Sequence, residues 1–186
     1  PTPLTHNDYD FQVKSAASLR NLSIVALLGG FIPDERLLYP KKGDGLQVVD
    51  IGGGPGFLAN SHAFSYPGAH YHTVDHNPEL SASAESLKQS FGHSNVSVHQ
   101  GNLQSFNLGN QGPWDVALSV DTYGQMLESD REGVFDTVDK VKDGGLVLFS
   151  YNCAVFNAQF DPFREFLKLF ASTQGNRPIE QTKSAL

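Results

Sequence analysis

VVDIGGGPGF, residues 48–57, decides the fold. An apolar strand runs into the acidic residue Asp50, then into a glycine-rich turn, and then into the start of a helix. This order is typical of sites where bare backbone closely approaches a nucleotide-type cofactor. A tight turn with no ligand is the alternative. Because Gly52, Gly53, Gly54 and Gly56 all add to the entropy lost on folding, we interpret the turn as a cofactor site.

The spacing of the glycines distinguishes between cofactors. A dinucleotide fingerprint, G-x-G-x-x-G, would need its third glycine at position 57, which is Phe57. The spacing Asp50-x-Gly52-x-Gly54-x-Gly56 instead resembles motif I of class I S-adenosylmethionine-dependent methyltransferases. The resemblance implies S-adenosyl-L-methionine as the cofactor. It also implies that Asp50 lies beside the cationic methionine portion, and that the backbone of the loop approaches it at Gly52, Gly53, Gly54 and Gly56.

Composition narrows the classes of partner. The chain has 186 residues, 39% hydrophobic and 18% charged, which fits one soluble domain of ordinary size. Its net charge is −7 and it has no Lys/Arg-rich run, so we expect neither a nucleic-acid partner nor a membrane partner. The single Cys153 excludes an intramolecular disulfide and a cysteine-based metal site. With no signal-like start and no long apolar run, we expect a cytoplasmic protein.

Strand-like and helix-like segments alternate along the chain. Strands are predicted at 46–51, 69–75, 95–99, 114–120 and 146–151, the last one starting after Gly144-Gly145. Helices are predicted at 11–28, 57–66, after the cap Asn77-Pro78, after a capping box at 129–132, and at 160–171. The alternation predicts an α/β fold with a doubly wound, mostly parallel sheet. This agrees with the Rossmann-like fold that the class I methyltransferase resemblance implies.

We divide the chain into an N-terminal helical cap or lid, residues 1–45, and an S-adenosylmethionine-binding core, residues 46–186. Tyr9 and Phe11 are candidates for a lid over the cofactor or for plain packing. In the resembling family the sheet closes with a sixth and an antiparallel seventh strand, yet the tail after the residue 160–171 helix has no strand pattern. An unpaired fifth strand is a hydrophobic edge. We therefore expect a chain whose C-terminal strands are missing, or a partner segment or subunit that covers this edge.

Further cofactor contacts follow from the resemblance. Asp75, at the end of the second strand, would accept hydrogen bonds from the ribose hydroxyls, and His76 would lie near the adenine edge. Asn102 and Leu103 follow the third strand where many relatives have an acid, so Asn102 would accept from adenine without a charge. Ser119 ends the fourth strand, where the sulfonium and methyl group usually lie.

Catalytic candidates are fewer. Asp121 and Tyr123 follow the fourth strand near the expected methyl position, with wall packing as the alternative role for each. No histidine follows His99, and the signatures of amino-group and cytosine-5 DNA methyltransferases are absent. His70, His72 and His76 cluster in sequence, but the first two share a strand face and the third lies beyond it. We therefore interpret them as structural and expect no metal.

The sequence thus predicts an S-adenosylmethionine-dependent methyltransferase that modifies an O or N acceptor on a small molecule or a protein side chain. Two alternatives stay open: a catalytically inactive methyltransferase-fold scaffold, and a nicotinamide-dependent oxidoreductase. Asn7-Asp8-Tyr9-Asp10 and Ser150-Tyr151-Asn152 are also similar to bacterial methyltransferases that carry a C-terminal regulatory domain, some of which modify protein lysines.

Overall fold

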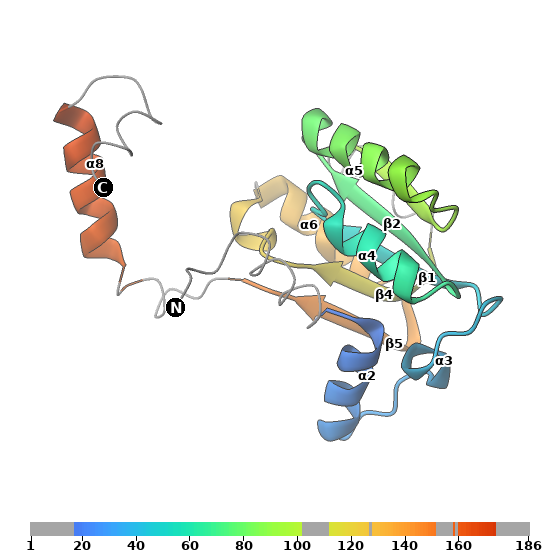
Figure 1. Cartoon of the computed structure of the whole chain (residues 1–186). Coiled ribbons are helices and arrows are strands. Elements are labelled where there is room, and N and C mark those ends of the chain that lie inside the picture. The colour runs from blue at the N-terminus through green and yellow to red at the C-terminus, as the bar shows by residue number, and fades with distance from the viewer. Residues whose placement is uncertain (1–16, 102–111, 127, 152–157, 159, 174–186) are drawn as a thin grey trace, which may run out of the picture. The chain divides into compact units, whose positions relative to one another are not determined.

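The computed structural model describes residues 17–101, 112–126, 128–151, 158 and 160–173. Two compact units divide the chain, Pro1–Tyr151 and Asn152–Leu186. The first contains the sheet and its helices, and the second contains helix α8, Asp161–Thr173 (Figure 1). None of the described helices is long and apolar enough to cross a membrane.

The sheet has five parallel strands in the order β3-β2-β1-β4-β5. Their bounds are Leu46–Ile51 for β1, Ala69–Asp75 for β2, Val96–Gln100 for β3, Trp114–Ser119 for β4 and Val141–Phe149 for β5. The central strand β1 pairs with β2 on one side and β4 on the other, so Asp50 lies between Thr73 and Leu118. The predicted doubly wound parallel sheet is confirmed.

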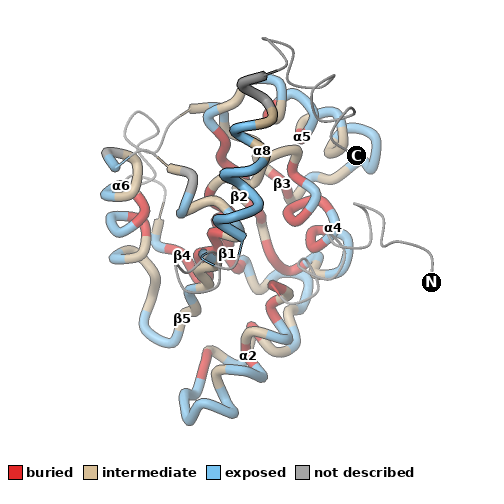
Figure 2. Tube along the Cα trace, turned by 90° about the vertical axis from the view of Figure 1, so that its left-hand side faces the viewer, coloured by how far each residue is buried: buried red, intermediate tan, exposed pale blue. Residues whose placement is uncertain are grey.

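Helices cover both faces of the sheet. They are α2 (Leu19–Leu28), α3 (Glu35–Leu38), α4 (Phe57–Ser65), α5 (Pro78–Phe91) and α6 (Glu128–Val138), with a short 3-10 turn at Tyr123–Gln125. Figure 2 shows α6 on one side of the strands and α4 and α5 on the other. Because side chains alternate along β1, Val48 packs with the cluster that contains Leu58 of α4, whereas Val49 packs with Val134 of α6. This burial on both faces explains why the strands are nearly all apolar.

The N-terminal residues described here pack on the sheet. Leu19 of α2 and Leu37 of α3 are fully buried in the same cluster as Leu46 of β1. The proposed boundary at residues 45 and 46 therefore lies within the first compact unit. Tyr9 and Phe11, the candidate lid residues, lie outside the described residues, and so does the start of the helix predicted at 11–28.

Two expected element starts were wrong. The fifth strand begins at Val141, ahead of Gly144-Gly145, and ends at Phe149. Its glycines accompany an irregular register opposite Trp114 and Val116, and Gly144 has φ +77°, so they mark a bulge within the strand. Helix α6 begins at Glu128, which places Ser129 inside the helix and rules out its role as the cap of a capping box.

A buried carboxylate ties four elements together at the amino ends of the strands. The Asp115 side chain is 3% exposed and lies 2.9 Å from Lys142 Nζ of β5 and 3.2 Å from an Arg36 guanidinium nitrogen of α3. It also accepts the backbone N–H of Gln47 in β1 at 2.7 Å. Each formal charge and each donor at this point is therefore paired.

Replacing this carboxylate should destabilise the protein. In Asp115→Ala the Gln47 amide loses its acceptor and Lys142 loses its counter-ion, while Arg36 keeps its ion pair with Asp34. We expect a loss of roughly 2–4 kcal/mol in the free energy of unfolding, measured by urea denaturation. Asp136→Ala removes an exposed acid from α6 and should cost less than about 0.5 kcal/mol. Equal losses in the two variants would contradict the role given to Asp115.

Three histidines form a row of ring contacts across β2 and β3, His70 with His72 and His72 with His99, and the second pair is also hydrogen-bonded. His72 Nε2 lies 3.0 Å from Gln47 Oε1, and His72 Nδ1 lies 3.1 Å from His99 Nε2. With Gln47 Oε1 as the acceptor, His72 donates from Nε2 and accepts at Nδ1 from His99 Nε2, so the His72 ring is neutral. Burial, followed by the neighbouring His70 and His99, lowers the pKa of His72 to about 4. No group of three metal-ligating side chains within the described ranges is arranged to hold an ion.

This row makes stability depend on pH. Between the unfolded-state pKa of about 6.5 and the folded-state pKa of about 4, the unfolded chain binds a proton at His72 that the folded chain does not. The free energy of unfolding should therefore fall as pH falls through that window. Denaturation at several pH values should show a shallower fall for His72→Gln, while His93→Gln, beyond the row, keeps the wild-type slope. Parallel profiles for wild type and His72→Gln would exclude this origin.

Candidate cofactor site

The loop after β1 is a glycine turn held on the neighbouring strand. Gly52, Gly54 and Gly56 have φ of +71°, +55° and +73°, a conformation that side chains rarely adopt. The backbone N–H groups of Gly52 and Gly53 both donate to Val74 O, at 2.8 and 3.1 Å. The chain thus leaves β1 while it is still anchored to β2.

The four glycines of the loop differ in what a side chain at each position would meet. A Cβ at Gly52 would overlap Thr122, one at Gly53 would overlap Thr73, and one at Gly56 would lie 2.6 Å from the Ala84 side chain. A Cβ at Gly54 would meet nothing within 4 Å. Gly52, Gly53 and Gly56 are therefore required by the packing of the protein itself, whereas Gly54 borders open space.

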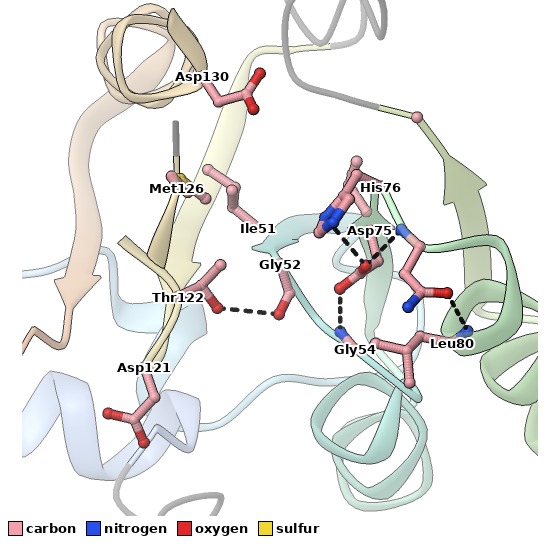
Figure 3. Close-up of a pocket in the computed structure, with 13 residues that line it drawn as sticks. Ile51, Gly52, Gly54, Asp75, His76, Leu80, Asp121, Thr122, Met126 and Asp130 are labelled. Atoms are coloured by element: carbon pink, nitrogen blue, oxygen red, sulfur yellow. Dashed lines mark hydrogen bonds and ion pairs between the residues drawn. The ribbon is translucent and has the colours of Figure 1, made fainter. Parts of the chain in front are cut away.

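That open space is a pocket of about 350 Å³ at the carboxyl edge of the sheet. Figure 3 shows two walls: the glycine loop with the end of β2 and the start of α5 on one side, and the segment after β4 with α6 on the other. The volume falls within the range of about 300–1,000 Å³ found for small-molecule sites. The pocket lies where the strands on the two sides of β1 connect in opposite directions. Open α/β sheets bind their ligands at such a point.

Asp75 joins the loop to the pocket. Its side chain is 9% exposed, Oδ2 accepts the Gly54 N–H at 2.9 Å and Oδ1 accepts the Asn77 N–H at 2.9 Å. A carboxylate has about four lone-pair positions, so two remain for a ligand. His76 Nδ1 lies 3.6 Å from Oδ1, and the His76 side chain is 82% exposed on the pocket rim.

Asp50 lies behind the loop rather than along the pocket. It is 2% exposed, and its Oδ2 has no hydrogen-bond partner among the described residues. A Cβ at Gly53 would come within 2.7 Å of that oxygen. Burial, followed by the negative charge of Asp75, raises the pKa of Asp50 to about 7. The expected contact between Asp50 and a cationic ligand stays a prediction, supported by a buried carboxylate oxygen that has no partner among the described residues.

The residues predicted beyond β4 divide into two groups. Asp121 lines the pocket, has φ +56° and accepts a hydrogen bond from Ser150 Oγ at 2.8 Å. Ser119 is fully buried with its Oγ unpaired among the described atoms, and it does not line the pocket. The Tyr123 ring packs edge-on against Phe135 and Phe149, outside the pocket lining. Asn102 and Leu103 lie outside the described residues.

Sequence reasoning did not identify Asp130, Met126 and Leu80 as pocket residues. Asp130 falls within the capping box predicted at 129–132, and Leu80 lies in the helix predicted after Asn77-Pro78. Thr122 was also missed, although its Oγ1 donates to Gly52 O at 3.1 Å. Asp121-Thr122 directly after a buried strand was the signal that pointed to this wall. Nothing in the sequence shows that the next helix brings Asp130 to it.

Solved structures share this fold at low sequence identity. PKMT2 from Rickettsia typhi, in complex with AdoHcy, aligns with a TM-score of 0.70 and 18% identity over 86% of this chain and 30% of that one. Coclaurine N-methyltransferase, bound to N-methylheliamine and SAH, aligns with a TM-score of 0.54 and 14% identity over 79% and 37%. This chain therefore spans about a third of the length of these two proteins.

A third structure, precorrin-6y C5,15-methyltransferase from Geobacter metallireducens, aligns with a TM-score of 0.50 and 18% identity over 67% of this chain and 62% of that one. No curated protein matches the sequence. The family model described as a methyltransferase domain matches residues 42–177, which include the glycine loop, every strand of the sheet and α8. This chain belongs to the methyltransferase-domain family, which uses S-adenosylmethionine.

Proposed function

We propose that this chain binds S-adenosyl-L-methionine in the pocket and transfers its methyl group to an O or N acceptor on a small molecule or a protein side chain. The observation that carries the proposal is Asp75. Its carboxylate fixes the Gly54 amide at the pocket wall and keeps two lone pairs for the ribose hydroxyls. Each such charge-assisted hydrogen bond is stronger than a neutral one.

The other residues fit the same ligand. Gly54 offers a backbone surface without a side chain, and the Gly52 carbonyl is held by Thr122. His76 is assigned to the adenine edge, and Asp50 to the cationic methionine portion behind the loop. When bound, the cofactor supplies a methyl group on a positively charged sulfur. The work of the protein is then to align the acceptor with that methyl group, and proximity alone supplies several kcal/mol.

Solved relatives support the choice of cofactor. PKMT2 and coclaurine N-methyltransferase were both crystallised with the demethylated product of this cofactor. The nicotinamide alternative has less support, because Phe57 stands at the third glycine position and begins α4. An inactive scaffold is the second candidate, favoured by the Tyr123 ring, which is packed between Phe135 and Phe149 rather than along the pocket.

The first test is calorimetric titration with S-adenosylhomocysteine, with NAD as the control ligand. We expect micromolar binding of S-adenosylhomocysteine alone, weakened about tenfold or more by Asp75→Ala. Because Asp75 also holds the loop, Asp75→Asn serves as an intermediate: it can still accept from Gly54 but lacks the charge. Circular dichroism confirms that each variant is folded. Equal affinity of wild type and Asp75→Ala would remove the basis of the proposal.

Gly54 offers a second test with a matched control. In Gly54→Ala the added Cβ projects into open pocket space, and φ +55° adds strain of about 1–2 kcal/mol. Gly92→Ala at the end of α5, with φ +66° and equally open space, has the same strain away from the pocket. We expect similar losses of stability in the two variants, but weaker S-adenosylhomocysteine binding only in Gly54→Ala. If both variants bind like wild type, Gly54 does not contact the ligand.

A further inference from the structure

The wall opposite Asp75 is acidic. Asp121 comes from the end of β4 and Asp130 from α6, and both line the same pocket (Figure 3). No lysine or arginine is among the described residues that line it, and His76 is the single basic side chain there. We infer that the methyl acceptor is an amine nitrogen and that Asp130 determines this specificity. This inference rests on the proposed function.

Asp130 differs from the other two pocket carboxylates in how it is engaged. Asp75 accepts from two backbone amides, and Asp121 accepts from Ser150 Oγ. No other described residue donates a hydrogen bond to Asp130, which is half-buried in the first turn of α6. An acid in a first helical turn also favours the helix dipole, so a test must separate that role from recognition.

The apolar surroundings limit the size and polarity of the acceptor. Met126 and Ile51 line the same pocket as Asp130 and bring apolar side chains to it (Figure 3). An alkyl chain can pack on these side chains while its nitrogen reaches the carboxylate. This combination of apolar lining and one placed charge is what a cationic aliphatic amine requires.

The balance of charge in the reaction favours nitrogen over an anionic oxygen acceptor. An ammonium first loses a proton to solvent water. The nitrogen lone pair then forms a bond to the methyl carbon as the carbon–sulfur bond breaks, and the bonding pair stays on sulfur. The positive charge thus moves from sulfur to nitrogen and is retained, so an acidic wall near the nitrogen favours the product side. An anionic phenolate or carboxylate acceptor would be repelled by the same wall.

Sinefungin tests this charge arrangement without knowledge of the acceptor. It is an analogue of the cofactor that carries an ammonium-bearing carbon where the methylated sulfur stands, whereas S-adenosylhomocysteine is uncharged at that point. We expect the wild type to bind sinefungin about tenfold more tightly than S-adenosylhomocysteine by calorimetry. Asp130→Asn should reduce that ratio to about threefold or less, with the dissociation constant of S-adenosylhomocysteine changed by less than about twofold.

Glu128→Gln is the matched control. It removes the same charge from the same first turn of α6, but Glu128 is exposed and does not line the pocket. It should leave the ratio at the wild-type value. If wild type binds S-adenosylhomocysteine but prefers it to sinefungin, or if Asp130→Asn and Glu128→Gln give the same ratio, the inference is overturned while the proposed function stands. If wild type binds neither ligand, both fall.

Discussion

The position of β1 is the constraint on which the rest of the structure depends. It is buried on both faces and paired on both edges, and the pocket lies at its carboxyl end. There the backbone must leave the sheet, and its polar groups still need partners. The Gly52 and Gly53 amides find a partner here because both donate hydrogen bonds to the Val74 carbonyl of β2. The loop is thereby held open toward the crevice between β2 and β4, where the pocket lies.

Three aspartates, Asp115, Asp75 and Asp50, lie in different electrostatic environments and differ in how their charge is compensated. Asp115, at the amino ends of the strands, is buried but fully compensated by Lys142, Arg36 and a backbone amide, so it serves the fold. Asp75 accepts hydrogen bonds from two backbone amides and keeps two lone-pair positions that a ligand could use. Asp50 is buried, one of its oxygens has no partner in the part of the chain that the structure describes, and burial raises its pKa to about 7. A cation above the loop would favour the charged form of Asp50. A positively charged ligand would therefore stabilise a carboxylate that burial in the folded protein destabilises.

Most of the fold could be predicted because its signals are local. The bounds of the first two strands follow from apolar runs ended by a turn, and Asn77-Pro78 begins α5 as predicted. The fifth strand could not be delimited in this way. Gly144-Gly145 looks like a turn before a strand, but pairing of residue 141 with Trp114 continues the ladder through it as a bulge. Tertiary pairing thus outweighed the local preference of two glycines.

The candidate site could be predicted more fully for one wall than for the other, where Asp121 was the residue predicted. Gly52, Gly54 and Asp75 lie in or directly after neighbouring strands, and parallel strands bring their carboxyl ends together, so sequence order gives spatial proximity. Asp130 reaches the pocket because α6 packs on the opposite face of the sheet through Val134. The same packing withdraws Tyr123 into an aromatic cluster. A motif therefore predicts the wall built from neighbouring strand ends, whereas the other wall depends on how a helix packs against the sheet.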